Sequence, residues 1–382
     1  MIISRLIIKN WKNFKNVDIS FKDRMFIIGP NASGKSNLLD VFRFLRDIVK
    51  QGGGFQKAVS DRGGMGKIRC LAARKDPEVS IEIHISESNS DDPLWKYAIG
   101  IRQEPRGKHQ PYLSFEKIWK EDLLLVNRPN KDDDKDPERL TQTFLEQINA
   151  NKDFRDISKF LEKVLYLHLV PQLLKYPNAF SGPDLPGDPF GRGFLDRLAK
   201  TSPKTRDSRL KKIGLALRYA VPQLNDLHFM QDENGKPHLE VRYEHWRPDA
   251  GKQQEDQFSD GTLRLIALLW SLQEGDGLLL LEEPELSLNG AIVSKIPGMV
   301  YNIQKSKKRQ IVMTTHSSDL LSDKGISRYE VALLTPDSEG TKMELAASKK
   351  EVVEMLNAGM TPAEAIIPKT RPANIEQLKF DF

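Results

Sequence analysis

Cysteine is almost missing from this chain, because Cys70 is the single cysteine among 382 residues. An intrachain disulfide is therefore excluded, and so is a zinc site built from several cysteines. No apolar run approaches the roughly 18 residues that a membrane-spanning helix needs. Residues 1–20 alternate apolar with polar side chains and do not have the pattern of a signal peptide. We expect a cytoplasmic protein that does not contact a membrane.

A strong excess of charge is also missing. The chain has 58 basic and 53 acidic residues, and the net charge of +5 is too small over this length to indicate nucleic-acid binding by itself. Two local basic clusters, Lys204–Lys212 and Lys305–Arg309, could contact the phosphates of DNA or RNA, or could be solvated faces. No heptad run is long enough for a coiled-coil arm.

The chain does contain a G-x-x-x-x-G-K-S motif, which lies between a predicted strand, Met25–Ile28, and a predicted amphipathic helix, Ser36–Val49. Its glycines permit backbone angles that let successive N–H groups face the phosphates of a nucleoside triphosphate. Lys35 would reach the β- and γ-phosphates, and the Ser36 hydroxyl would bind Mg²⁺. The predicted ATP-binding residues are Gly29, Pro30, Asn31, Ala32, Ser33, Gly34, Lys35, Ser36 and Asn37.

Two carboxylates end a second predicted strand. The apolar run Leu278–Leu281 has the length of a buried parallel strand and leads directly into Glu282 and Glu283. Unpaired carboxylates are costly at a buried strand end, and a Mg²⁺ held by Glu282 through water, beside Ser36, would compensate their charge. Glu283 could then accept a proton from the water that attacks the γ-phosphate.

Two further segments complete the pattern. The predicted strand Gln310–Thr314 is followed by Thr315 and His316, and ligands bind at the strand ends of open α/β sheets. We expect His316 to sense the γ-phosphate, although a lone histidine can also be structural. The segment Phe258–Leu265 opens a predicted helix, which either Ser259 or Asp260 would cap.

Four motifs occur in order: the phosphate loop, S-D-G-T-L-R-L, L-L-L-L-E-E-P-E and T-T-H-S-S. Together they resemble the ABC-type ATPase head of the SMC, RecF and OLD (overcoming lysogenization defect) group. The resemblance implies an α/β fold: a P-loop ABC-ATPase head with a mixed or parallel sheet core, an antiparallel β lobe and a helical insertion. It also implies Mg²⁺-dependent hydrolysis of ATP, with Glu283, His316 and Lys35 as catalytic residues. One departure is Glu282, which stands where many relatives have aspartate.

The same resemblance implies a dimer in which the signature segment acts on ATP bound to a second copy. The signature residues are Ser259, Asp260, Gly261 and Thr262. Gln172 is the candidate for the glutamine that approaches the Mg²⁺ in this group, and a plain helix or strand terminus is the other interpretation of that residue.

We divide the chain into five segments. The antiparallel lobe is expected to contain the strands Val79–Ile85, Lys96–Arg102 and Leu113–Leu125. The segments are residues 1–75 (N-terminal part of the ATPase core), 76–130 (antiparallel β lobe), 131–225 (mainly helical insertion), 226–335 (C-terminal part of the core) and 336–382 (C-terminal extension).

The whole pattern, including the closing segment Thr361–Pro372, is similar to the stand-alone ATPase subunits of abortive-infection and Rlo-type phage-defence systems. That similarity implies an ATP-dependent homodimer or higher oligomer that regulates a separate effector, such as a TOPRIM-like nuclease, with DNA or RNA as the sensed ligand. The alternative is a DNA-repair clamp of the RecF or SMC kind. A fused nuclease is disfavoured because the segment after His316 lacks the required acidic D-x-D spacing. The signature also differs from that of membrane transporter motors.

Overall fold

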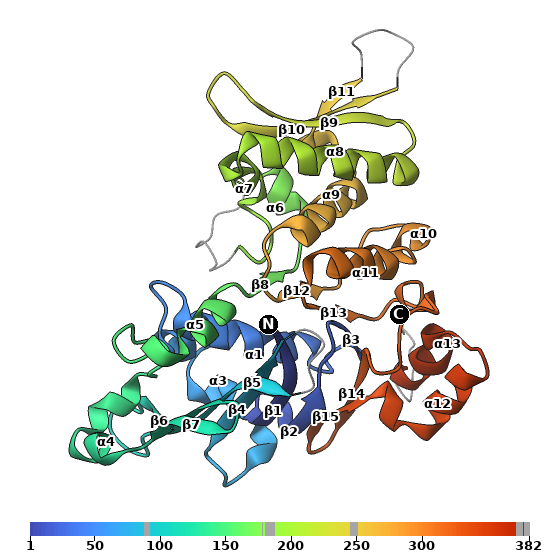
Figure 1. The fold of residues 1–382 in the computed structure, drawn as a ribbon. Coiled ribbons are helices and arrows are strands. Elements are labelled where there is room, and N and C mark those ends of the chain that lie inside the picture. Colours follow the sequence, from blue (N-terminus) through green and yellow to red (C-terminus); the bar gives the residue numbers. More distant parts are fainter. Residues whose placement is uncertain (88–91, 178, 180–187, 245–250, 372–376, 378–382) are drawn as a thin grey trace.

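The computed structural model describes residues 1–87, 92–177, 179, 188–244, 251–371 and 377 (Figure 1). Pro372, the last residue of the closing segment that contributes to the phage-defence resemblance, lies outside them. Three sheets organise the described residues: a central mixed sheet, an antiparallel sheet and a small three-stranded sheet. In Figure 1 the central sheet crosses the middle of the molecule, with the antiparallel sheet below it and the small sheet above. Within the described residues, no helix combines the length and the apolar character that crossing a bilayer requires.

The central sheet has the strand order β15-β14-β3-β13-β12-β8. Strands β14, β3, β13, β12 and β8 run parallel, and β15 is the antiparallel edge partner of β14. Both faces of the parallel part are covered, which explains its continuous apolar runs. Leu279 and Leu281 belong to the hydrophobic cluster on one face, and Leu280 to the cluster on the other. The bounds are β3 Arg24–Ile28, β8 Leu165–Leu167, β12 Leu279–Glu282, β13 Ile311–Thr315, β14 Val331–Asp337 and β15 Gly340–Leu345.

The antiparallel sheet has the order β2-β1-β4-β5-β6-β7, so it includes the first two strands of the chain and crosses the segment boundary that we placed at residue 75. Helix α1, Lys35–Val49, packs between this sheet and the central sheet. Leu38 and Phe42 of α1 share one buried cluster with Ile81 of β4 and Val312 of β13. The bounds are β1 Ile2–Trp11, β2 Phe14–Ser20, β4 Val79–Ser86, β5 Pro93–Gln103, β6 Pro111–Lys120 and β7 Leu123–Arg128.

One local prediction was wrong, and one strand was not predicted. The expected strand over 113–125 is instead two strands, β6 and β7, because the chain turns at Glu121, where φ is 52°. No glycine, proline or asparagine marks that turn in the sequence. Strand β8 lies in the segment expected to be mainly helical. It forms because Leu165–Leu167 pairs with Leu279–Leu281, and tertiary pairing decides the conformation of so short an apolar run.

Helices α9 and α11 cover the second face of the central sheet, and above them α8 packs on the three-stranded sheet β11-β10-β9 to form an upper lobe (Figure 1). The α/β architecture with a mixed sheet core agrees with the expected fold class. The remaining bounds are α2 Phe55–Ser60, α3 Met65–Ile68, α4 Lys131–Lys135, α5 Arg155–Glu162, α6 Pro171–Lys175, α7 Phe194–Lys200, α8 Pro203–Ala220, β9 Leu224–Gln231, β10 Pro237–Tyr243, β11 Lys252–Gln254, α9 Asp260–Gln273, α10 Gly290–Val293, α11 Ile296–Lys307, α12 Lys350–Asn357 and α13 Pro362–Ile366.

Candidate nucleotide-binding site

The phosphate loop joins β3 to α1. Gly34 precedes the helix with φ 95°, and no side chain caps it. The N–H groups of a first helical turn have no partner within the helix. In α1 the first helical hydrogen bond is the one from the Leu38 N–H to the Gly34 carbonyl, at 2.9 Å. The loop therefore presents N–H groups at the positive end of a 15-residue helix, an arrangement that suits phosphate oxygens.

Both motif glycines are required by close packing. A Cβ on Gly29 would lie 2.5 Å from the Ser33 hydroxyl and 2.9 Å from the Leu334 backbone oxygen. A Cβ on Gly34 would collide with the side-chain amide of Asn13 and would also strain the left-handed backbone. Any other residue at either position would change the shape of the loop.

Asn13, in the turn between β1 and β2, braces the phosphate loop. Its Nδ2 donates to the Ser33 carbonyl at 2.9 Å and to Thr341 Oγ1 at 2.7 Å, and its Oδ1 accepts from Asn37 Nδ2 at 2.8 Å. The loop is thereby connected to β15, more than 300 residues away along the chain. The motif does not identify Asn13, because the contact exists only once three distant segments are folded together.

Lys35 is held inside the loop. Its Nζ donates to the carbonyls of Gly29 and Pro30, at 3.0 and 3.3 Å, and lies 3.7 Å from Glu283 Oε1. The lysine is buried, so its charge is poorly solvated and is balanced by these oxygens. A phosphate in the loop would offer stronger anionic partners than two carbonyls do.

Ser36 and Glu282, the two residues predicted at the metal, are in direct contact. The Ser36 hydroxyl donates to Glu282 Oε1, and the hydroxyl of Tyr166 on β8 donates to Glu282 Oε2. Burial, and then the neighbouring Glu282 carboxylate, raise the pKa of Tyr166, so this phenol stays a hydrogen-bond donor. Tyr166 was not predicted, because only the pairing of β8 with β12 brings it to this strand end.

The oxygens of Ser36 and Glu282 fit Mg²⁺, which prefers oxygen ligands and is usually completed by water and substrate phosphates. In the described part of the chain, no group of three or more histidine, cysteine, aspartate or glutamate side chains could hold a metal ion by itself. A metal at this position would therefore depend on the nucleotide for the rest of its coordination.

Glu283 and His316, the predicted base and sensor, face each other. His316 Nδ1 lies 3.1 Å from Glu283 Oε1, because β12 and β13 are parallel neighbours that end at the same edge. Glu283 has φ 44°, a left-handed conformation that is uncommon outside glycine, and its N–H donates to the Thr314 carbonyl at 3.1 Å. This turn at the strand end brings the carboxylate within reach of Lys35.

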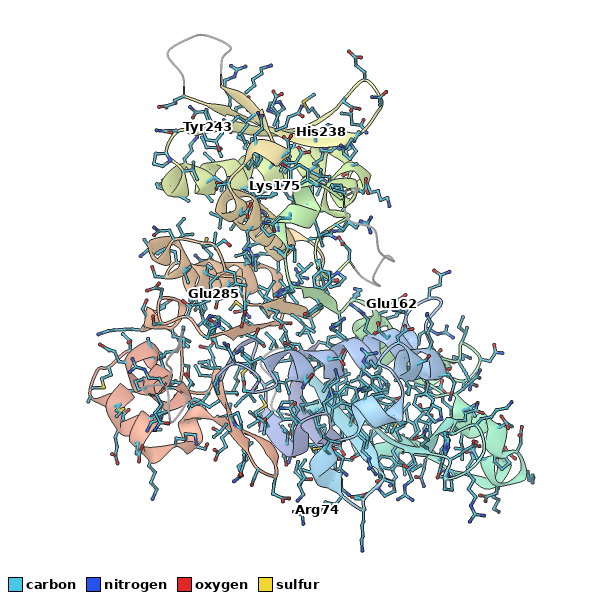
Figure 2. The ribbon with its side chains drawn as sticks, turned by 180° about the vertical axis from the view of Figure 1, so that it is seen from behind. Arg74, Glu162, Lys175, His238, Tyr243 and Glu285 are labelled. Atoms are coloured by element: carbon cyan, nitrogen blue, oxygen red, sulfur yellow. The ribbon has the colours of Figure 1, made fainter. Side chains whose placement is uncertain are left out.

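The signature segment is capped by Ser259, whose hydroxyl accepts from the Thr262 N–H at 3.1 Å. Asp260 instead accepts from Gln172 Nε2 and Lys175 Nζ, both at 2.7 Å. Among the described residues the Gln172 amide thus contacts the signature and makes no hydrogen bond to Ser36 or Glu282. The chain has left the central sheet after β8 and entered α6 in the upper lobe, where Lys175 is labelled in Figure 2.

Within the described residues, no hydrogen bond or ion pair connects Ser259–Thr262 with the phosphate loop of the same chain. The signature helix α9 instead starts beside the segment that follows β12, since a Cβ on Gly261 would lie 2.6 Å from the Ser287 carbonyl oxygen. The structure thus brings Lys35, Ser36, Glu282, Glu283 and His316 together, and among the described residues the signature makes no hydrogen bond or ion pair with any of them.

Two buried charged side chains follow the signature and β12 closely in the sequence. Arg264 of α9 has two nitrogens, and Glu285 has one oxygen, without a hydrogen-bond partner. The other oxygen of Glu285 accepts from the Thr315 hydroxyl. Burial raises the pKa of Glu285 and lowers the pKa of Arg264, so both charged forms are disfavoured in this arrangement.

Comparison with known proteins shows which family the chain belongs to. A family model described as "AAA domain, putative AbiEii toxin, Type IV TA system" matches residues 24–323. The DNA replication and repair protein RecF of Bacillus cytotoxicus is 30% identical over 133 residues, and that of Bacillus thuringiensis 27%; each match covers 33% of this chain and 33% of the relative. The matched region thus spans about a third of the length of these curated relatives.

Among solved structures, an SMC head bound to the C-winged helix domain of ScpA superposes with a TM-score of 0.55 at 14% identity, over 90% of this chain and 98% of that one. At this level of identity the superposition speaks for the fold alone. It confirms the predicted fold class, an α/β architecture with a mixed sheet core like that of an SMC head.

Proposed function

The chain belongs to this AAA domain family, within the ABC-type ATPases of the SMC and RecF group, and from that premise we propose that it is the ATPase subunit of a phage-defence pair. In this proposal two copies enclose ATP and Mg²⁺, hydrolyse the ATP, and thereby regulate a separate effector protein of the TOPRIM-like nuclease class. The observation that supports ATP hydrolysis in this proposal is the convergence of Lys35, Ser36, Glu282, Glu283 and His316 at one sheet edge.

ATP binding would use the groups that the loop leaves unpaired. The N–H groups of the first turn of α1 face the phosphates, and Lys35 exchanges the carbonyls of Gly29 and Pro30 for phosphate oxygens. Mg²⁺, when bound, neutralises part of the phosphate charge. Ser36 would hold it directly, and Glu282 would hold it through water while Tyr166 fixes the carboxylate.

Hydrolysis would begin at Glu283. Its carboxylate accepts a proton from a water molecule, the water oxygen forms a bond to the γ-phosphorus, and the bond from that phosphorus to the β–γ bridging oxygen breaks. The bond electrons leave with ADP. His316, 3.1 Å from the same carboxylate, orients Glu283 and is close enough to the strand end to hydrogen-bond a γ-phosphate oxygen.

A second copy would complete the site. Ser259, Asp260, Gly261 and Thr262 start helix α9, whose N-terminal N–H groups favour an anion. Since these residues are apart from the phosphate loop of their own chain, the γ-phosphate that they contact would belong to the other subunit. ATP would then stabilise the dimer, and loss of the γ-phosphate would weaken it by the lost contacts.

The proposal is tested by measuring ATP turnover and ATP-dependent association of Lys35→Ala and Glu283→Gln. We expect turnover to fall at least about a hundredfold in both. Glu283→Gln should still dimerise with ATP in light scattering, whereas Lys35→Ala should not. The matched control is Glu233→Gln, since Glu233 is exposed in the β9–β10 turn, and it should behave as the unmodified chain does. Unchanged turnover in both site variants would contradict the proposal.

The second candidate function is a DNA-repair clamp, which the 30% identity to RecF favours. A clamp would bind bare duplex DNA in an ATP-dependent way, with an affinity that falls steeply with salt. A regulatory subunit would instead bind its effector and show weak, ATP-independent affinity for DNA. Gel-shift titrations over a range of salt concentrations, with and without ATP, distinguish the two.

A further inference from the structure

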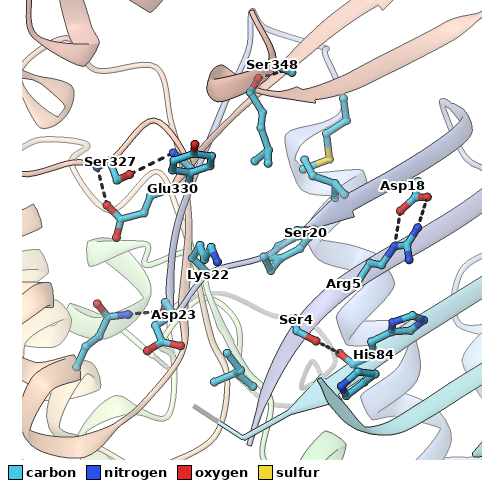
Figure 3. A pocket seen from close by; sticks show the side chains of 18 of the residues that line it. Ser4, Arg5, Asp18, Ser20, Lys22, Asp23, His84, Ser327, Glu330 and Ser348 are labelled. Carbon is cyan, nitrogen blue, oxygen red and sulfur yellow. Dashed lines mark hydrogen bonds and ion pairs between the residues drawn. The ribbon is translucent and has the colours of Figure 1, made fainter. Parts of the chain in front are cut away.

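A large cleft lies away from the nucleotide site. It has a volume of about 1440 Å³ and is lined by β1, β2, β4, β15 and the end of α11 (Figure 3). Lys22 and Asp23, just before β3, also line it, so it is at the opposite end of β3 from the phosphate loop. The volume exceeds the roughly 300–1,000 Å³ of typical small-molecule sites, which indicates a larger occupant.

Two sheet edges border this cleft. β2 is the edge strand of the antiparallel sheet, and β15 is the edge strand of the central sheet. At one end the edges are joined, because the Thr341 N–H donates to the Asn13 carbonyl at 2.7 Å. Farther along, Asp18 and Ser20 of β2 and Met343 of β15 line the cleft.

The main chain of these residues is directed toward the cleft side of each strand. The Phe21 N–H donates to the Ser4 carbonyl at 2.8 Å, and hydrogen-bonded pairs alternate along an antiparallel ladder, so the N–H and C=O of Ser20 and Asp18 point away from β1. The Thr341 N–H points away from β14, because it donates to Asn13. By the same alternation, the N–H and C=O of Met343, two residues later in β15, also point away from β14. Outside the strand ladders, no main-chain hydrogen bond of the described residues uses Asp18, Ser20 or Met343.

The charge left over in the cleft is positive. Its acids have partners within the chain: Asp18 pairs with Arg5 at 2.6 Å, and Glu330 with Arg24 and Glu344 with Lys349, each at 2.8 Å. Asp23 is engaged as well. Of the four lysines that line the cleft, Lys96 pairs with Asp122 at 3.5 Å, whereas Lys22, Lys305 and Lys308 have no ion pair within the described residues. Two exposed rings, Tyr301 and Tyr329, also line the cleft, and exposed tyrosine is typical of interfaces.

We propose that this cleft is a docking site for an extended, acidic segment of a partner protein, which adds as a strand to the open edge of β2 or β15 while its carboxylates pair with Lys22, Lys305 and Lys308. Strand addition explains why main-chain groups and not only side chains face the cleft. The identity of that partner as the effector rests on the proposed function; the chemistry of the segment does not.

A protein segment fits this cleft better than a nucleic-acid strand does. Asp18, Asp23, Glu330 and Glu344 line it even though each is engaged, and a phosphate on every nucleotide would be repelled by them. A peptide strand can place its acidic side chains toward the lysines and its neutral ones toward the carboxylates, because alternate residues of a strand face opposite sides.

The test uses a fluorescein-labelled peptide of about ten residues that alternates glutamate with valine, titrated against the whole protein by fluorescence anisotropy. The comparison probes are the same peptide N-methylated at alternate residues, a lysine–valine peptide, and an oligo(dT) of about 20 nucleotides. The cleft variant is Lys22→Glu with Lys305→Glu. The matched control is Lys204→Glu with Lys211→Glu, two exposed lysines of α8 that do not line the cleft.

We expect the glutamate–valine peptide to bind, and N-methylation or the cleft variant to weaken it at least about tenfold, while the control variant binds as the unmodified chain does. Absence of binding, indifference to N-methylation, or oligo(dT) binding that the cleft variant abolishes would each overturn the inference. ATP turnover of the cleft variant is measured in parallel. Retained turnover with lost peptide binding separates this site from the nucleotide site, and peptide binding by a chain without turnover would refute only the proposed function.

Discussion

Replacing Asn13 by alanine tests how the phosphate loop is held. The substitution removes three hydrogen bonds, from Asn13 to Ser33 and Thr341 and from Asn37 to Asn13, with lengths of 2.9, 2.7 and 2.8 Å. At about 0.5–1.5 kcal/mol net for each bond, Asn13→Ala should lower the free energy of unfolding by about 2–4 kcal/mol. The loop would also lose the group that fills the space beside Gly34.

ATP affinity should also fall, because the phosphate loop is less ordered without Asn13. If about 1.4–2 kcal/mol of the loss is local to the loop, binding of a fluorescent ATP analogue weakens about ten- to thirtyfold. Urea unfolding and fluorescence titration measure the two effects, and amide hydrogen exchange of residues 31–37 should accelerate. Asn13→Asp, which keeps the acceptor for Asn37 and loses both donated bonds, should be intermediate.

The matched control is Asn16→Ala in the same turn region. Asn16 is exposed, so its substitution should change the free energy of unfolding by less than about 0.5 kcal/mol. If Asn13→Ala bound ATP as the unmodified chain does and unfolded with unchanged free energy, the bracing role of Asn13 would be refuted. Equal losses in both variants would point to a general weakening of the β1–β2 turn and would refute it too.

Three other predictions concern dimerisation, the metal and a buried ion pair. Ser259→Arg should prevent ATP-dependent dimerisation in light scattering while leaving binding of the ATP analogue within about twofold, and a dimer that persists would contradict completion of the site by a second copy. Removal of Mg²⁺ with EDTA should abolish turnover and weaken but not eliminate nucleotide binding, because Lys35 and the loop N–H groups remain; undiminished turnover would count against Ser36 and Glu282 as ligands. Asp40→Asn should cost about 3–5 kcal/mol in urea unfolding at neutral pH, because Asp40 is buried against Arg62 at 2.9 Å and Lys12 at 2.6 Å. Burial alone would raise the pKa of Asp40, but Arg62 and Lys12 outweigh burial and lower that pKa. The stabilisation is therefore present above the ordinary pKa of aspartate and is lost as the pH falls through the lower pKa of the folded state. If Asp40→Asn left the urea-unfolding free energy equally pH-dependent below about pH 4, this role of Asp40 would be contradicted.

The local chemistry of the site could be predicted from the sequence. The spacing of Gly29, Gly34 and Lys35 requires a tight loop before a helix, and the run before Glu282 and Glu283 requires a buried strand with a polar end. Each of these statements depends on residues that are neighbours in the chain, so a short window contains the relevant physics. The same holds for the cap at Ser259, where the sequence left two residues open and the hydrogen bond to Thr262 selects one.

The surroundings of the site could not be predicted in that way. Strand β8 exists because its residues pair with β12, and Tyr166 reaches Glu282 only through that pairing. Gln172 was the candidate for the glutamine near the Mg²⁺, but in the folded chain its amide binds Asp260. Short segments of this kind have no strong preference of their own, so long-range contacts decide their conformation.

By itself the sequence determined which residues can hold a phosphate and a metal, because glycine at a strained turn, a lysine behind it and carboxylates at a strand end are required by local geometry and charge. Only the tertiary structure decided what braces and completes that site. Asn13, Thr341 and Tyr166 act there because residues separated by more than a hundred positions meet at one sheet edge, and no local pattern encodes that meeting.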